Sequence, residues 1–143
     1  MSAVLVVIEH DLDVLRAADQ IIELGPGSGR DGGLVTATGT ADALMALATV
    51  TGQALKNDGP SDDFASAASA DPSSADPHPI RLRGVQTNNQ QDLEVEFPVP
   101  GFTVVTGVSG SGKSSLVFDS LYGESRARMT EHLSSHVQRR VGH

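Results

Sequence analysis

The residues best suited to chemistry are GVSGSGKS, from Gly107 to Ser114, which fit the phosphate-binding pattern G-x-x-x-x-G-K-[ST]. Glycines let the backbone approach closely, so that successive N–H groups can point at phosphate oxygens. Lys113 supplies a positive charge for the β- and γ-phosphates, and the Ser114 hydroxyl is a ligand for Mg²⁺. The pattern predicts a site for ATP or GTP.

The elements on either side agree with this interpretation. The apolar run Phe102–Thr106 predicts a short buried strand, and Ser115–Tyr122 predicts the first turns of a helix. The helix start adds its dipole to the same phosphate cradle. The alternative is a flexible Gly/Ser linker that contains one lysine. The strand, the lysine–serine pair and the helix together favour the phosphate loop.

Composition limits the fold and the environment. The 143 residues are 38% hydrophobic and only 3% aromatic, with no Trp, so aliphatic side chains must fill the core, as in an α/β sheet covered by helices. There is no Cys for a disulfide or a thiolate metal site. The apolar run after Met1 is too short for a signal peptide or a membrane span, so we expect a cytoplasmic protein without a membrane partner.

Charge divides the chain. Residues 1–79 carry 3 Lys/Arg and 12 Asp/Glu, whereas residues 80–143 carry 7 and 6, which accounts for a total of −8. The acidic half disfavours a nucleic-acid surface there. We predict three segments: 1–56, an acidic linker at 57–79, and 80–143. The linker is rich in Asp, Ser, Ala and Pro and holds one large apolar residue, Phe64.

Within the first segment, strands are predicted at Val4–Ile8, Ile21–Leu24 and Leu34–Ala37. A short helix through Ala18 is capped by Asp11 or Asp13, and a second helix spans Asp42–Val50 with Thr40 as its N-cap. A glycine-rich loop covers residues 25–33.

In the third segment, alternation predicts half-exposed strands at Ile80–Val85 and Leu93–Phe97. A polar helix is expected over Ser125–Val141, with Met129, Leu133 and Val137 on one stripe. His132 and His136 have the spacing of metal ligands, but no third ligand is near, so a solvated helix face is favoured. The arginines Arg126, Arg128, Arg139 and Arg140 receive no DNA role, because a charged helix is more often a solvated surface.

Longer strings carry a family resemblance. The third segment, especially TGVSGSGKSSL, FDSLY and the Glu/Arg/Leu-Ser tail, resembles the beginning of an ATP-binding cassette of the UvrA excinuclease family. The run VVIEHDLDVLRAADQIIELGPGSGRDGGLVTATGT is similar to the end of such a cassette, and Thr51-Gly52-Gln53 fits the exit from the first cassette. These stretches cover about three quarters of the chain.

The resemblance implies an α/β P-loop NTPase fold of the ABC ATPase type in two partial cassettes. Segment 1–56 would be the C-terminal part of a first cassette and segment 80–143 the N-terminal part of a second. His10 would then sense a γ-phosphate, as the catalytic residue. The loop pattern and the resemblance together give the predicted nucleotide-binding residues Gly107, Ser109, Gly110, Ser111, Gly112, Lys113, Ser114 and Ser115, with Ser114 also on the metal.

In a complete cassette of the family the phosphate loop comes first and the histidine last, whereas in this chain the histidine precedes the phosphate loop. This order predicts that His10 and Lys113 serve different ATP sites. A permuted arrangement, with the first segment's strands beside the phosphate-loop strand, is the open alternative. The sequence departs from the family at Gln90, where members usually have Leu after two Asn residues. It also lacks the family's signature motif, its acidic strand end and its zinc modules.

The resemblance implies a parent protein that uses ATP and Mg²⁺ in recognising DNA damage during nucleotide excision repair. Its partners would be DNA, another protein of the excision-repair system and a second copy of the parent. Two alternatives are a drug-resistance paralogue of the same family and a non-catalytic fragment. In either case we expect this chain alone to be inactive in ATP hydrolysis, because it lacks the signature motif and the acidic base.

Overall fold

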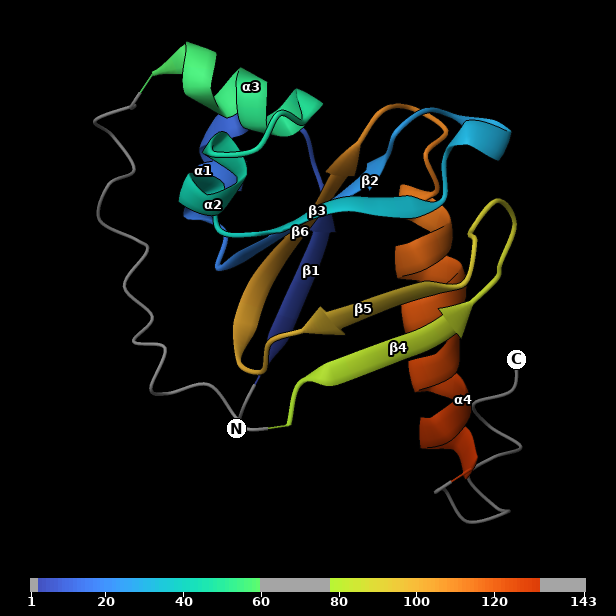
Figure 1. Cartoon of the computed structure of the whole chain (residues 1–143). Coiled ribbons are helices and arrows are strands. Elements are labelled where there is room, and N and C mark those ends of the chain that lie inside the picture. Colours follow the sequence, from blue (N-terminus) through green and yellow to red (C-terminus); the bar gives the residue numbers. More distant parts are fainter. Residues whose placement is uncertain (1–2, 60–77, 132–143) are drawn as a thin grey trace.

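The strand that leads into the phosphate loop, β6 (Gly101–Gly107), lies inside a four-stranded sheet (Figure 1). This computed structural model describes residues 3–59 and 78–131. The strand order is β1–β6–β2–β3. β1 (Val4–Ile8) and β2 (Gln20–Gly25) both run parallel to β6, and β3 (Leu34–Gly39) runs antiparallel to β2. The strand of the third predicted segment, β6, therefore lies between two strands of the first segment, β1 and β2.

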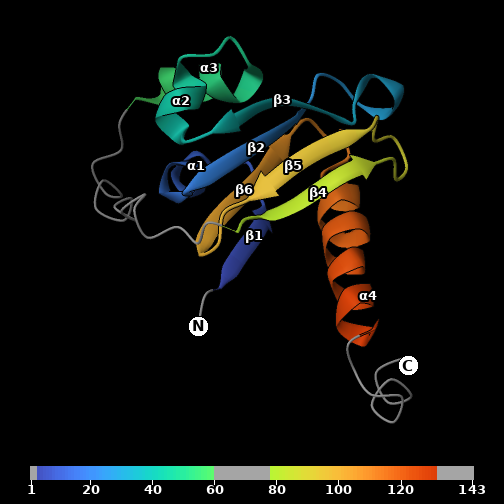
Figure 2. The same ribbon diagram turned by 60° about the horizontal axis from the view of Figure 1, so that its bottom comes forward.

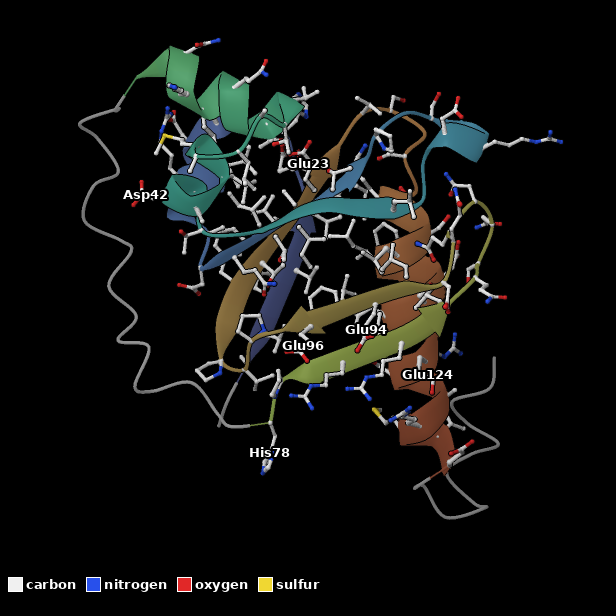
Figure 3. All side chains as sticks on the ribbon, in the orientation of Figure 1. Glu23, Asp42, His78, Glu94, Glu96 and Glu124 are labelled. Atoms are coloured by element: carbon white, nitrogen blue, oxygen red, sulfur yellow. The ribbon has the colours of Figure 1, made fainter. Side chains whose placement is uncertain are left out.

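The second sheet is a hairpin of β4 (Ile80–Val85) and β5 (Leu93–Phe97), with the bounds that the alternating pattern predicts. Every second residue of β5 is buried. The glutamates between them, Glu94 and Glu96, form ion pairs with Arg83 at 2.8 Å and Arg81 at 2.6 Å on β4 (Figure 3). The hairpin thus has one face in the core and a charged face outward.

Three short helices follow the strands of the first segment. Of the two predicted caps, Asp11 is the one that caps α1 (Leu12–Ala17), by accepting from the N–H groups of Asp13 and Val14. Thr40 caps α2 (Ala41–Met45), as predicted. The glycine-rich loop contains a 3₁₀ turn, η1 (Gly29–Asp31).

The prediction of one helix over Asp42–Val50 is wrong. α2 ends at Met45, and a separate helix α3 (Val50–Asp58) follows. Its N-cap is Thr49, whose hydroxyl accepts from the N–H of Gly52. A Cβ at Gly52 would lie 2.1 Å from the carbonyl oxygen of Leu44, so glycine lets α3 fold back closely on α2. The tertiary contact outweighs the helix propensity of the Ala/Leu run.

Helix α3 also continues through Asn57 and Asp58, the first two residues of the predicted linker. Arg16 of α1 fixes its end, donating to the carbonyl oxygens of Leu55 at 3.2 Å and Gly59 at 2.5 Å and pairing with Asp58 at 2.9 Å. Residues 60–77 of the linker, with Phe64, lie outside the described residues.

After the phosphate loop comes a π-helix, η3 (Ser115–Tyr122), which runs straight into α4 (Gly123–Glu131) (Figure 2). The sequence predicts a helix here but not its wider π form. α4 buries no side chain, and Met129 of the predicted apolar stripe is 62% exposed. Leu133, Val137, His132, His136, Arg139 and Arg140 lie outside the described residues.

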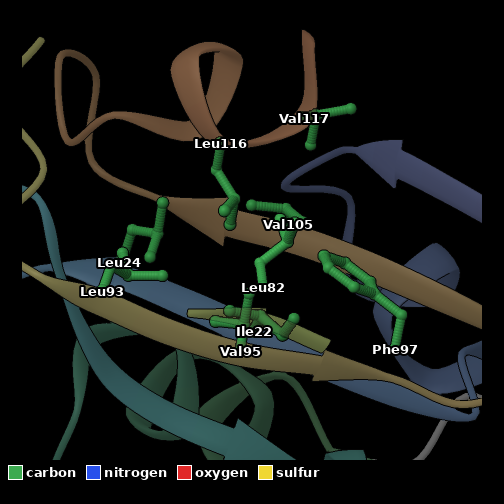
Figure 4. Packing of buried hydrophobic residues seen from close by; sticks show 9 residues of the cluster. All are labelled: Ile22, Leu24, Leu82, Leu93, Val95, Phe97, Val105, Leu116 and Val117. Carbon is green, nitrogen blue, oxygen red and sulfur yellow. The ribbon is translucent and has the colours of Figure 1, made fainter. Parts of the chain in front are cut away.

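The four-stranded sheet has an apolar layer on each side. One layer packs the sheet against the hairpin and η3 (Figure 4); its buried members are Ile22, Leu24, Leu82, Leu93, Val95, Phe97, Val105, Leu116 and Val117. The other packs it against α1, α2 and α3; its buried members are Leu15, Ala18, Ile21, Ala37, Ala41, Leu44, Leu55 and Val104. Neighbouring residues such as Val104 and Val105 serve opposite layers, as the alternation of a strand requires.

Polar contacts also join the first and third segments at the start of β6, the end of the strand that lies away from the phosphate loop. The Asp19 carboxylate accepts from the N–H of Phe102 at 2.7 Å, and the N–H of Asp19 donates to the carbonyl of Phe102 at 2.9 Å. Gln20 Nε2 donates to the carbonyl oxygen of Glu96 at 3.1 Å. The segments are therefore parts of one folded unit.

The fold is mixed α/β, as predicted. Among residues 3–59 and 78–131, no helix has the length and apolar character needed to cross a membrane.

Candidate phosphate-binding site

The phosphate loop joins the carboxyl end of β6 to η3, the position that the sequence predicts. Gly107 and Gly112 have φ values of +138° and +102°, which side-chain-bearing residues rarely adopt. A Cβ on Gly107 would lie 2.1 Å from the carbonyl oxygen of Leu24, and one on Gly112 would lie 2.9 Å from Asn89 Oδ1. The backbone angle favours glycine at both positions, and at Gly107 the backbone of the neighbouring strand also leaves no room for a side chain.

Donors outside the loop hold successive carbonyl groups of the loop. The Gly110 oxygen accepts from the N–H of Gly29 at 3.0 Å and from Asn89 Nδ2 at 3.1 Å. The Ser111 oxygen accepts from the N–H of Gly33 at 2.9 Å.

A third carbonyl held in this way is that of Gly112, which accepts from the N–H of Leu116 at 3.0 Å and from Gln90 Nε2 at 3.2 Å. In a trans peptide the N–H points away from the C=O of the same unit. Holding the carbonyls of Ser111 and Gly112 against these donors therefore directs the N–H groups of Gly112 and Lys113 to the opposite side. A loop of this kind is preorganised for an anion.

Lys113 folds back over the loop. Its Nζ donates to the carbonyl oxygens of Gly107 and Val108, both at 2.9 Å. Burial removes water from the ammonium and lowers the pKa of Lys113 below the ordinary 10.5. A phosphate oxygen is a stronger partner for this ammonium than a carbonyl oxygen, because it carries charge.

The predicted serines differ in their surroundings. Ser109 and Ser114 are exposed, and Ser115 Oγ accepts from Asn88 Nδ2 at 2.8 Å. Ser111 is fully buried, and its hydroxyl has no hydrogen-bond partner among the described residues. The Ser114 hydroxyl is thus accessible to a ligand, whereas Ser111 is packed in the interior.

His10 lies at the same edge of the sheet as the loop. Val7 pairs with Val104 and Ile8 with Val105 in the parallel register of β1 and β6, and the loop and His10 both follow these strand ends. The His10 side chain is 94% exposed, with Nδ1 3.8 Å from Glu9 Oε2. The observed pairing of β1 with β6 is the strand arrangement of the permuted alternative, in which strands of the first segment lie beside the phosphate-loop strand.

Two surrounding loops were not predicted as parts of the site. One is the glycine-rich loop with Gly29 and Gly33, and the other is the turn between β4 and β5 with Asn88, Asn89 and Gln90. Asn88 has a φ of 56°, which asparagine tolerates better than most residues. The dense run of amide side chains in residues 86–91 was the available signal, but their contacts to the phosphate loop depend on tertiary packing.

Metal binding by side chains alone is not indicated in the described part of the chain, where no group of three or more His, Cys, Asp or Glu is gathered. The residues present fit Mg²⁺ bound with a nucleotide, for which Ser114 would be the protein ligand. Mg²⁺ commonly keeps several waters and takes its other ligands from phosphates.

The strand, glycine loop, lysine and helix define a mixed α/β chain with a phosphate-loop sequence. Curated proteins to which it is similar include several called UvrABC system protein A. The chain is 44% identical over 125 residues to the protein from Streptomyces avermitilis, and 41% identical over 118 residues to that from Escherichia coli K12. These alignments cover 85% and 82% of the chain but 12% of either relative.

The resemblance to the UvrA excinuclease family is therefore confirmed, and the chain is homologous to a segment of UvrABC system protein A. No protein-family model and no solved structure matches the chain.

Proposed function

We propose that this chain binds Mg²⁺-ATP through the loop 107–115, as the nucleotide-binding portion of a UvrA-type ATPase. The observation that carries the proposal is the arrangement of the Ser111 and Gly112 carbonyls. Outside donors hold both, which directs the N–H groups of Gly112 and Lys113 to the opposite side. The Lys113 ammonium lies over the same loop, at the carbonyl oxygens of Gly107 and Val108. Lys113 and the backbone N–H groups bind and orient the phosphates, and Ser114 holds the metal.

The pairing of β1 with β6 supports a single site that also includes His10. Both strands end at one sheet edge, so a nucleotide in the loop lies beside the segment that follows Ile8. His10 is exposed there and can approach a terminal phosphate. The phosphate loop of the third segment and the histidine of the first would then form one site, although their order along the chain is reversed.

For the parent protein, we propose a role in nucleotide excision repair, with recognition of damaged DNA, association with another protein of the excision system and self-association as a dimer. The support is the homology to UvrABC system protein A over 82–85% of this chain. ATP hydrolysis in such a parent needs further residues beyond those of this chain.

The test is binding of a fluorescent ATP analogue, with and without Mg²⁺, to the wild-type chain and to Lys113→Ala. We expect saturable binding by the wild type and loss of binding in the variant, since backbone N–H groups alone do not offset the phosphate charge. Lys56→Ala is the matched control, because Lys56 is an exposed residue of α3. Equal affinity of Lys113→Ala and wild type would refute the phosphate-loop assignment.

A further inference from the structure

The turn between β4 and β5 places one buried amide side chain against the phosphate loop. Gln90 is 5% exposed, although it stands in a run of polar residues. Its Nε2 donates to the carbonyl oxygen of Gly112 at 3.2 Å, and its Oε1 accepts from the Ser120 hydroxyl at 3.3 Å. The carboxamide therefore bridges the phosphate loop and η3.

The hydrogen bond from Gln90 acts on a glycine, the residue type with the greatest conformational freedom. Glycine has a wide choice of φ and ψ, so the peptide unit between Gly112 and Lys113 can rotate unless something holds it. The Gly112 carbonyl accepts one bond from Leu116, within the start of the helix, and a second from Gln90. The second donor fixes the carbonyl from outside the helix, and the planar peptide then fixes the direction of the Lys113 N–H.

We propose that Gln90 is a positioning residue for nucleotide phosphates, which it serves by orienting the Gly112–Lys113 peptide unit. The inference rests on the proposed binding of ATP by this loop. Leucine has nearly the same volume and would fill the same buried space without an unsatisfied polar group. Glutamine at this position also donates to the Gly112 carbonyl and so fixes the orientation of that carbonyl, which leucine cannot do.

The test compares ATP and inorganic tripolyphosphate, both with Mg²⁺, on the wild type, Gln90→Leu and the control Gln53→Leu, at an exposed position of α3. We expect Gln90→Leu to lower the affinity for both ligands by a similar factor of about three to ten, the scale of one hydrogen bond. Its thermal midpoint should stay within a few degrees of the wild type, because the core remains filled. Gln53→Leu should change neither affinity.

Gln90→Glu adds a readout that a packing role would not affect. The side chain keeps its shape and can accept from Ser120, but its carboxylate cannot donate to Gly112. Relative to the wild type at each pH, the affinity of this variant should recover on acidification, because the protonated carboxyl regains a donor. Burial raises the pKa of a carboxyl group and brings this recovery toward accessible pH.

The outcomes separate the two claims. Wild-type binding that Gln90→Leu leaves unchanged would overturn the positioning role alone. So would a loss of affinity that merely follows a loss of thermal stability, with no recovery of Gln90→Glu at low pH. An absence of ATP and tripolyphosphate binding by the folded wild type would instead overturn the proposed function and this inference together.

Discussion

The backbone N–H of Glu9 donates to the carbonyl oxygen of Val105 at 3.2 Å, which extends the pairing of β1 and β6 to the residue before His10. Through this bond, the first segment of the chain reaches the edge of the sheet from which the phosphate loop departs. The segments are separated in sequence by the linker, yet they meet at the place where a nucleotide is expected.

Two glycines of the loop 25–33 offer a matched stability test. Gly33 has a φ of +78°, and a Cβ there would lie 1.9 Å from the carbonyl oxygen of Asn89. Gly29 has a φ of +58°, but a Cβ there would meet nothing within 4 Å. We expect Gly29→Ala to lower the free energy of unfolding by about 1 kcal/mol, from backbone strain alone.

For Gly33→Ala we expect a loss of about 3 kcal/mol or more, because the strain is joined by a clash that moves the turn at Asn89. Urea unfolding of both variants measures the difference. Nucleotide affinity should fall with Gly33→Ala, since Gly33 donates to the Ser111 carbonyl. Similar unfolding free energies for the two variants would show that the loops do not meet in this way.

Binding of ATP should weaken at alkaline pH. Burial lowers the pKa of Lys113 below 10.5, so the ammonium loses its proton earlier than an exposed lysine does as pH rises. Phosphate favours the charged form and so raises the pKa of Lys113 in the complex. Between the lowered pKa of the free chain and the higher pKa of the complex, binding takes up a proton and the affinity falls with increasing pH.

Calorimetric titrations in buffers of different ionisation enthalpy measure this proton uptake. Lys113→Arg is the control, because arginine stays charged throughout this range and its affinity should vary less. A wild-type affinity that is as insensitive to alkaline pH as that of Lys113→Arg would contradict the role of the Lys113 ammonium.

His10 should discriminate ATP from ADP. Because His10 is proposed to approach the γ-phosphate, which ADP lacks, we expect His10→Ala to weaken the binding of ATP by about threefold to tenfold, the scale of one hydrogen bond. The affinity for ADP should stay nearly unchanged. His78→Ala is a control at the start of the hairpin segment, away from the loop edge (Figure 3). Equal losses for both nucleotides, or no loss, would separate His10 from the site.

Neither the wild type nor His10→Ala should release phosphate from ATP above background, because the sequence lacks the signature motif and the acidic base. Lys113-dependent hydrolysis that disappears in His10→Ala would contradict this expectation and show a self-sufficient site.

Local patterns in the sequence predicted much of the secondary structure. The alternation in Leu93–Phe97 gives that strand its bounds, because side chains on one face of the hairpin must be buried. The apolar run before Gly107 similarly predicts β6. In contrast, the break between α2 and α3 depends on the approach of Gly52 to Leu44, which no local pattern encodes.

The candidate site was predicted only in part. Spacing identifies Lys113 and Ser114, because the phosphate loop is a continuous segment. The contributions of Gly33 and Gln90 come from loops that reach the site through tertiary contacts, and their types alone predict turns. The pairing of β1 with β6 joins distant parts of the chain, and the sequence left two arrangements open for it.

The most direct test of one composite site is a disulfide across β1 and β6, followed by titration with Mg²⁺-ATP. Leu5 and Phe102 are register partners on adjacent strands, which suits a disulfide, and the chain has no other Cys. We predict that Leu5→Cys/Phe102→Cys forms an intramolecular crosslink and still binds one ATP per chain, with an affinity close to that of the wild type. A double variant that stays reduced under oxidising conditions, or a crosslinked chain that no longer binds ATP, would contradict the account.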